Sequence, residues 1–150
     1  GTTRAAMMFL SNFLCSFGRT GQLEISSRYL SGSCVRVSQN SSVTDCLRRG
    51  GAVVVRLYLL EDPHYILLTG VDEERIYAFD PYLLEEPLPE KDIIVTDAHP
   101  YRYNRVIPFS YFNRTGHTQY ALGETAGREA VLLFNTHTEL TEEKTIEYII

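Results

Sequence analysis

The spacing of apolar residues along this chain changes near Gly51. Before this point, apolar side chains recur at steps of three and four in AAMMFLSNFLCSF (residues 5–17), which predicts a helix with one broad apolar face. After it, the runs AVVVRLYLL, HYILLTGV and RIYAFD are rich in β-branched and aromatic residues and are separated by the turn-like EDP and DEE. We expect these three runs to form consecutive antiparallel strands.

Shorter elements are predicted on both sides of these strands. GQLEISSRYLSG (21–32) is expected to hold one or two helical turns, and SSVTDCLRRGG (41–51) a short helix capped by Ser41 or Ser42 and stopped at Gly50. Further along, DIIVTD and YNRVIPF are strand candidates, FSYFNRTG is a helical turn, REAVLLFN is a strand, and LTEEKTIEYII fits either a helix or a strand. Helices followed by a mostly antiparallel sheet indicate an α+β fold.

Composition restricts the classes of function. The 150 residues fit one domain, 1–150, with an ordinary 44% of hydrophobic and 22% of charged residues. The net charge of −5 argues against a nucleic-acid-binding surface, and the longest apolar runs are too short for membrane insertion. Three cysteines, Cys15, Cys34 and Cys46, are too few and odd in number for a disulfide scaffold, and they favour a reducing, cytoplasmic compartment.

The stretch DPHYILLTGVDEERIYAFDP (62–81) contains the candidate chemistry. A hairpin that turns near residues 72–74 would bring His64, at the start of one strand, beside Asp80, at the end of the next. An imidazole titrates near neutrality and a carboxylate can hold its second nitrogen, so the two residues suit a general base and its orienting partner. The structural alternative is that Asp80 and Pro81 end a strand in a turn and that His64 is a solvated strand residue.

Residues 51–82, GAVVVRLYLLEDPHYILLTGVDEERIYAFDPY, resemble the histidine–aspartate half of papain-like cysteine peptidases, specifically the bacteriocin-processing (double-glycine leader) peptidases and their relatives. The matching stretches are HYILLTG (64–70) and IYAFDP (76–81). The resemblance implies a papain-like fold, in which a buried N-terminal helix packs on a twisted antiparallel sheet. It implies His64 as the general base, Asp80 as its orienting partner, and no metal or organic cofactor.

The same family places its nucleophile in a Cys-Gly-small-small sequence at the start of a long apolar helix. The N-terminal GTTRAAMMFLSNFL resembles the helix sequence on the C-terminal side of that cysteine. The resemblance therefore puts the nucleophile immediately before Gly1 and implies oxyanion or substrate contacts at Gly1 and Thr2. A helix N-terminus favours a thiolate, and its N–H groups can line an oxyanion hole. Cys15, Cys34 and Cys46 remain open as substitutes, although none has this glycine-rich, helix-opening context.

The resemblance therefore implies a thiol hydrolase acting on an extended peptide or acyl substrate, and an acyltransferase would use the same apparatus. A catalytically inactive member of the fold, serving as a peptide-binding or docking module, is the alternative. An unrelated α+β domain is a third reading. Metal binding is not indicated, because no two cysteine or histidine residues have a close ligand spacing such as C-x-x-C.

Overall fold

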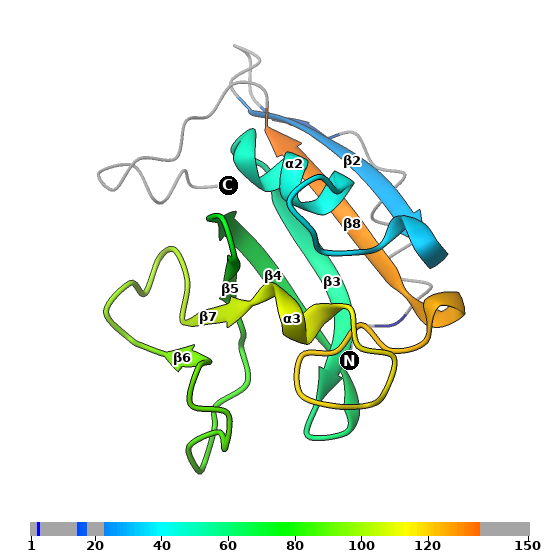
Figure 1. Cartoon of the computed structure of the whole chain (residues 1–150). Coiled ribbons are helices and arrows are strands. Elements are labelled where there is room, and N and C mark those ends of the chain that lie inside the picture. The colour runs from blue at the N-terminus through cyan, green and yellow to red at the C-terminus, as the bar shows by residue number, and fades with distance from the viewer. Residues whose placement is uncertain (1–2, 4–14, 18–22, 136–150) are drawn as a thin grey trace.

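The computed structural model describes residue 3, residues 15–17 and residues 23–135 (Figure 1). Within these residues the chain forms a mixed α/β domain around one sheet of eight strands, in which every neighbouring pair is antiparallel. The strand order is β1-β2-β8-β3-β4-β5-β7-β6. The strands are β1 (Cys15–Phe17), β2 (Leu23–Ser31), β3 (Ala52–Leu59), β4 (Asp62–Val71), β5 (Arg75–Phe79), β6 (Ile94–Val95), β7 (Arg105–Pro108) and β8 (Glu129–Asn135).

The helices of the described part are short. They are η1 (Gly32–Cys34), α2 (Ser42–Arg48), α3 (Phe109–Phe112) and η2 (Thr125–Gly127). No helix among the described residues is long and apolar enough to cross a bilayer.

Most of the predicted elements are confirmed. β3, β4 and β5 are consecutive antiparallel strands, and the β4–β5 turn lies at the predicted DEE (72–74). The β3–β4 turn is at Leu60 and Glu61, so Asp62 and Pro63 of the predicted EDP turn belong to β4 instead. The predicted short helix is α2, and its cap is Ser41, whose side chain accepts a hydrogen bond from the Thr44 N–H. The later strands β6, β7 and β8 and the helical turn α3 also lie within the predicted stretches.

Two predictions near the N-terminus are wrong. The stretch 21–32 does not form helical turns: Leu23–Ser31 is a strand that pairs with β8 from Ile25–Asn135 to Ser31–Glu129. The predicted helix of residues 5–17 does not reach its expected end, because Cys15–Phe17 is a strand paired with β2. Pairing with a distant strand overrides local propensity in both cases. Residues 5–14 of that helix, like the tail 140–150, lie outside the described residues.

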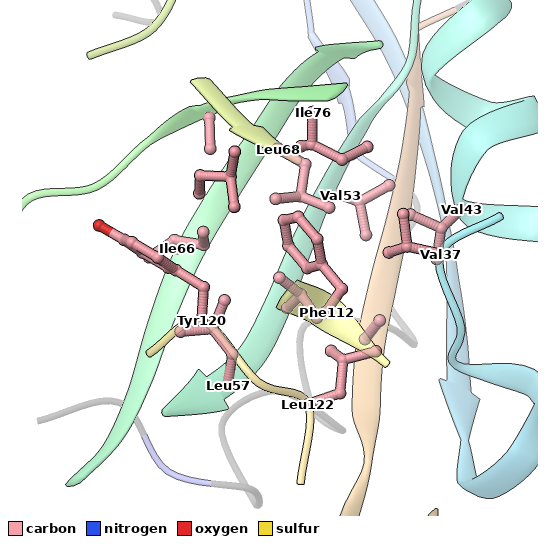
Figure 2. Close-up of a cluster of buried hydrophobic side chains, with 14 of the residues drawn as sticks. Val37, Val43, Val53, Leu57, Ile66, Leu68, Ile76, Phe112, Tyr120 and Leu122 are labelled. Atoms are coloured by element: carbon pink, nitrogen blue, oxygen red, sulfur yellow. The ribbon is translucent and has the colours of Figure 1, made fainter. Parts of the chain in front are cut away.

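The hydrophobic core lies between one face of the sheet and the segments that carry α2 and α3 (Figures 1 and 2). Alternate residues of the central strands point into it, with exposed fractions between 0% and 2%: Val53, Val55, Leu57, Ile66, Leu68, Ile76 and Ala78. Phe112 of α3 and Tyr120 of the following loop pack against these side chains, and both are 0% exposed. Residues on this face are therefore positioned by a closely packed core.

Candidate active site

The β4–β5 hairpin carries one extra residue on β4, between Leu68 and Gly70. On the side of the turn, Gly70 pairs with Tyr77, whereas beyond the irregularity Leu68 pairs with Ala78. The register on the two sides therefore differs by one position, which is the mark of a β-bulge.

This shift decides which side chain of β4 faces Asp80. Extending the register beyond the bulge by one residue puts Asp80 opposite Ile66, on the buried face that His64 also occupies. A one-residue change of register turns the side chains of a strand to its other face. If the register on the turn side continued without the bulge, Asp80 would share a sheet face with Tyr65 instead of His64.

His64 and Asp80 are in direct contact. Nε2 of His64 lies 2.7 Å from Oδ1 of Asp80, within the range of a charge-assisted hydrogen bond. The Asp80 side chain is 0% exposed, whereas the His64 side chain is 21% exposed. The predicted proximity of His64 and Asp80 is therefore observed: the carboxylate is buried and the imidazole is partly exposed at the surface.

Backbone contacts fix the position of Asp80. The N–H of Tyr82 donates to Asp80 Oδ1 over 2.9 Å, an Asx turn in which the aspartate side chain accepts from the residue two positions later. The side-chain amide of Asn104 takes the place of a strand partner: it accepts from the Asp80 N–H and donates to the Asp80 carbonyl oxygen, each over 2.8 Å. Asp80 thus has little freedom to move along or away from the sheet.

The second carboxylate oxygen of Asp80 contacts Tyr120. The Tyr120 hydroxyl lies 3.0 Å from Asp80 Oδ2, and Nε of Arg105 lies 3.1 Å from the same hydroxyl. A guanidinium group can only donate, so Arg105 donates to the tyrosine oxygen and the tyrosine hydrogen points to Asp80. The remaining nitrogens of Arg105 donate to the carbonyl oxygens of Asn104 and Tyr82, each over 3.0 Å.

These contacts determine the charge of the carboxylate. Burial raises the pKa of Asp80, but hydrogen bonds from His64, the Tyr82 N–H and Tyr120 outweigh burial and hold this pKa below its usual value. Burial and the nearby charge of Asp80 raise the pKa of Tyr120, so its hydroxyl remains a donor at neutral pH. Asp80 is therefore ionised at neutral pH.

The other nitrogen of the His64 ring is available for chemistry. An ionised carboxylate only accepts hydrogen bonds, so a neutral His64 carries its hydrogen on Nε2 and keeps the lone pair on Nδ1. Within the described part of the chain, no hydrogen bond is made by Nδ1. The Tyr82 ring lies edge-on to the imidazole, with 6.1 Å between ring centroids, and it is 42% exposed. The arrangement presents a basic nitrogen beside an exposed aromatic ring.

Neither described cysteine side chain lies close to His64. Cys34 ends η1, directly after β2, and β8 and β3 separate β2 from β4, a distance of about 14 Å across the sheet. Cys46 Sγ contacts the carbonyl oxygens of Ala52 and Leu133, about 17 Å along β3 from the position opposite His64. Burial raises the pKa of Cys46 to about 11, so this thiol stays protonated at neutral pH.

Other predicted residues are not described by the structure. Gly1 and Thr2 lie outside the described residues, as does the side chain of Cys15, although its backbone is in β1. Among residues 23–135, no three cysteine, histidine, aspartate or glutamate side chains group closely enough to hold a metal ion.

Sequence reasoning missed the polar residues behind Asp80. Tyr120, Arg105 and Asn104 lie 24 to 40 positions after Asp80 in the chain, so no hairpin spacing points to them. One signal was present: an arginine that begins an otherwise apolar strand, RVIP, is expected to be buried only with partners.

The chain was compared with family models, curated proteins and solved structures, and none of them matches it.

Proposed function

We propose that this chain carries the base half of a papain-like thiol enzyme, a cysteine peptidase or acyltransferase acting on an extended peptide or acyl substrate. The observation that carries the proposal is the 2.7 Å contact between His64 Nε2 and a fully buried Asp80 carboxylate. A surface histidine–aspartate pair needs no such arrangement of Tyr82, Asn104 and Tyr120 around its carboxylate. Strongly constrained ionisable pairs are typical of catalytic sites.

The geometry suits acyl transfer. His64 Nδ1 would take the proton of a thiol, the thiolate would attack the carbonyl carbon, and the C–S bond would form as negative charge moves to the oxygen. His64 would then give the proton to the leaving amine as the C–N bond breaks. Water, or an acceptor amine, would release the acyl group by the same steps in reverse order. Asp80 would hold the ring in place and stabilise its charged form throughout.

An exposed aromatic ring beside the dyad, followed in the chain by an exposed leucine, supports a peptide or acyl substrate. Tyr82 is 42% exposed and lies edge-on to His64, and the next residue, Leu83, is 85% exposed. Large exposed apolar side chains grouped at a polar site are typical of surfaces that bind a ligand.

The expected cysteine immediately before Gly1 provides the test. A protein extended by the residues encoded upstream of Gly1 would be treated with iodoacetamide and digested for mass spectrometry. We expect alkylation at that cysteine near neutral pH, and at least a tenfold slower reaction in His64→Ala, because the histidine no longer removes the thiol proton.

His99→Ala is the matched control, since His99 is exposed and its ring contacts Tyr103 instead of the dyad. It should leave the rate of alkylation unchanged. A residue other than cysteine at this position, or alkylation equally fast in His64→Ala, would reject the enzyme.

A second candidate is a catalytically inactive member of the same fold that serves as a peptide-binding or docking module. The positions of Cys34 and Cys46, both remote from His64, favour it over an enzyme that uses a thiol of the described region. The rejecting outcomes of the alkylation experiment would support this candidate.

A further inference from the structure

We propose that Tyr120, backed by Arg105, is a positioning residue of this site, and that its hydroxyl fixes the rotation and the charge of the Asp80 carboxylate. The inference rests on the proposed function only where His64 is treated as a base. The contacts themselves do not depend on a nucleophile or a substrate.

Backbone conformation sets Tyr120 apart from an ordinary core tyrosine. Its φ is +56°, in the left-handed region that bulky residues rarely adopt. Three backbone hydrogen bonds hold the loop in this form: Tyr120 N–H to the Tyr58 carbonyl, Tyr58 N–H to the Ala121 carbonyl, and Leu122 N–H to the Phe112 carbonyl. A strained residue that its surroundings hold in place is a reason to look for a function.

The hydroxyl group is the part of Tyr120 that packing does not explain. The ring is 0% exposed and lies beside Ile66 and Leu57, where a phenylalanine would fill almost the same volume. In Figure 2 the hydroxyl oxygen points out of the apolar cluster. There it joins Arg105 to Asp80, so the buried cation and the buried anion are connected through one neutral group.

The groups facing the Asp80 carboxylate come from three different parts of the fold. β4 supplies His64, the chain after β5 supplies the Tyr82 N–H, and the loop before η2 supplies the Tyr120 hydroxyl, with Arg105 of β7 behind it. His64 and Tyr82 both contact Oδ1, whereas Tyr120 contacts Oδ2. Among the described residues, Tyr120 is therefore the group that holds Oδ2, and it adds to the two contacts on Oδ1 in resisting rotation of the carboxylate about the Cβ–Cγ bond.

The variant Tyr120→Phe tests this role. Carbon-13 NMR of the Asp80 carboxyl group would follow its titration, and nitrogen-15 NMR of the His64 ring would report which nitrogen carries the hydrogen. We expect the midpoint of the Asp80 titration to move to higher pH, because a donor to the ionised form is lost. We also expect more of the neutral His64 to carry its hydrogen on Nδ1, because Asp80 loses one of the contacts that hold its carboxylate in the orientation facing Nε2.

Tyr111→Phe is the matched control. Tyr111 is also a buried tyrosine whose hydroxyl donates to an aspartate, in this case Asp92, and it makes no contact with the dyad. Its removal should leave both the Asp80 titration and the His64 tautomer unchanged. Similar changes in both variants would show a general loosening of the core and would overturn the proposal.

A folded Tyr120→Phe protein with an unchanged Asp80 midpoint and an unchanged tautomer would also overturn it. If this variant does not fold, the parent protein supplies a second measurement: the Tyr120 hydroxyl proton should exchange slowly and be visible by NMR, and rapid exchange would reject the contact. Since these measurements need no thiol, failure to alkylate a cysteine before Gly1 would reject the proposed enzyme while leaving this inference standing.

Discussion

The environment of the Asp80 carboxylate depends on a few individual hydrogen-bond donors. Each of its oxygens has a separate set of donors, with His64 and the Tyr82 N–H on Oδ1 and the Tyr120 hydroxyl on Oδ2. Because the side chain is 0% exposed, water cannot replace any donor that is lost. Small changes at this residue should therefore have measurable effects on stability and on the ionisation of the site.

Asp80→Asn should change how stability depends on pH. The pKa of Asp80 is lower in the folded chain than in the unfolded one, so its ionisation stabilises the fold above the unfolded value of about 4, and this contribution disappears as the pH falls through the folded pKa. In urea denaturation we expect Asp80→Asn to lose about 1–3 kcal/mol at pH 7. Below pH 4 the difference from the parent protein should become smaller.

The exposed residue Asp97 provides the comparison. Asp97→Asn should remain within about 0.5 kcal/mol of the parent at both pH values, as is usual for surface substitutions. A loss in Asp80→Asn that is equally large at pH 7 and pH 3 would contradict the assigned ionisation.

The two described cysteines should differ sharply in reactivity. Cys34 is exposed, whereas Cys46 is buried and its pKa is raised to about 11, so about one Cys46 thiol in a thousand is ionised at pH 8. Iodoacetamide should therefore alkylate Cys34 at least about 100-fold faster than Cys46 in the folded protein. Peptide mass spectrometry distinguishes the two sites, and alkylation in urea, where both should react, is the control. Equal rates in the folded state would contradict the burial of Cys46.

At the scale of elements, the local pattern was sufficient wherever an element is stabilised by its own sequence. α2 is an example, because Ser41 and Thr44 form a capping box in which the side-chain oxygen of each residue accepts a hydrogen bond from the backbone N–H of the other. β2 is the opposite case: its sequence LEISSRYLS lies in a stretch that predicts helical turns, and the strand exists because β8 pairs with it along its length. The bulge in β4 also depends on tertiary pairing: Gly70 is a residue typical of bulges, but the position of the extra residue is set by the pairing of β4 with β5.

The cap of α2 gives a prediction at this scale. Ser41→Ala removes a buried hydroxyl that accepts from the Thr44 N–H, and we expect a loss of about 1–2 kcal/mol in urea denaturation. Ser42→Ala, one position later and exposed, should cost less than about 0.5 kcal/mol. Equal losses in the two variants would mean that the capping hydrogen bond contributes nothing specific.

At the scale of the whole molecule, the dyad depends on the core beneath it. Leu57 and Ile66 lie on the same sheet face as His64, and Phe112 of α3 packs against this face together with Tyr120. The loop that contains Tyr120 begins soon after α3 and returns to β3 through the pairing with Tyr58. Packing of α3 and the position of the Tyr120 hydroxyl are therefore linked.

Phe112→Ala tests this dependence. The side chain is 0% exposed, so its truncation should cost about 3–5 kcal/mol in urea denaturation. Leu83→Ala, at a position that is 85% exposed, should cost less than about 0.5 kcal/mol. A loss below about 1 kcal/mol in Phe112→Ala would contradict the packing of α3 on the sheet.

The sequence by itself determined the three-strand meander, the short helix and the placement of His64 and Asp80 at the same end of the β4–β5 hairpin, whereas the bulge in β4 decided that their side chains share one face. These features depend on contacts between residues near one another in the chain, where periodicity, turn residues and caps carry the information. Only the tertiary structure decided the strand state of residues 23–31, the burial of Cys46 and the presence of Tyr120, Arg105 and Asn104 around Asp80. Each of these depends on a partner far away in the chain, and the free energy of such a contact is not encoded in any local pattern.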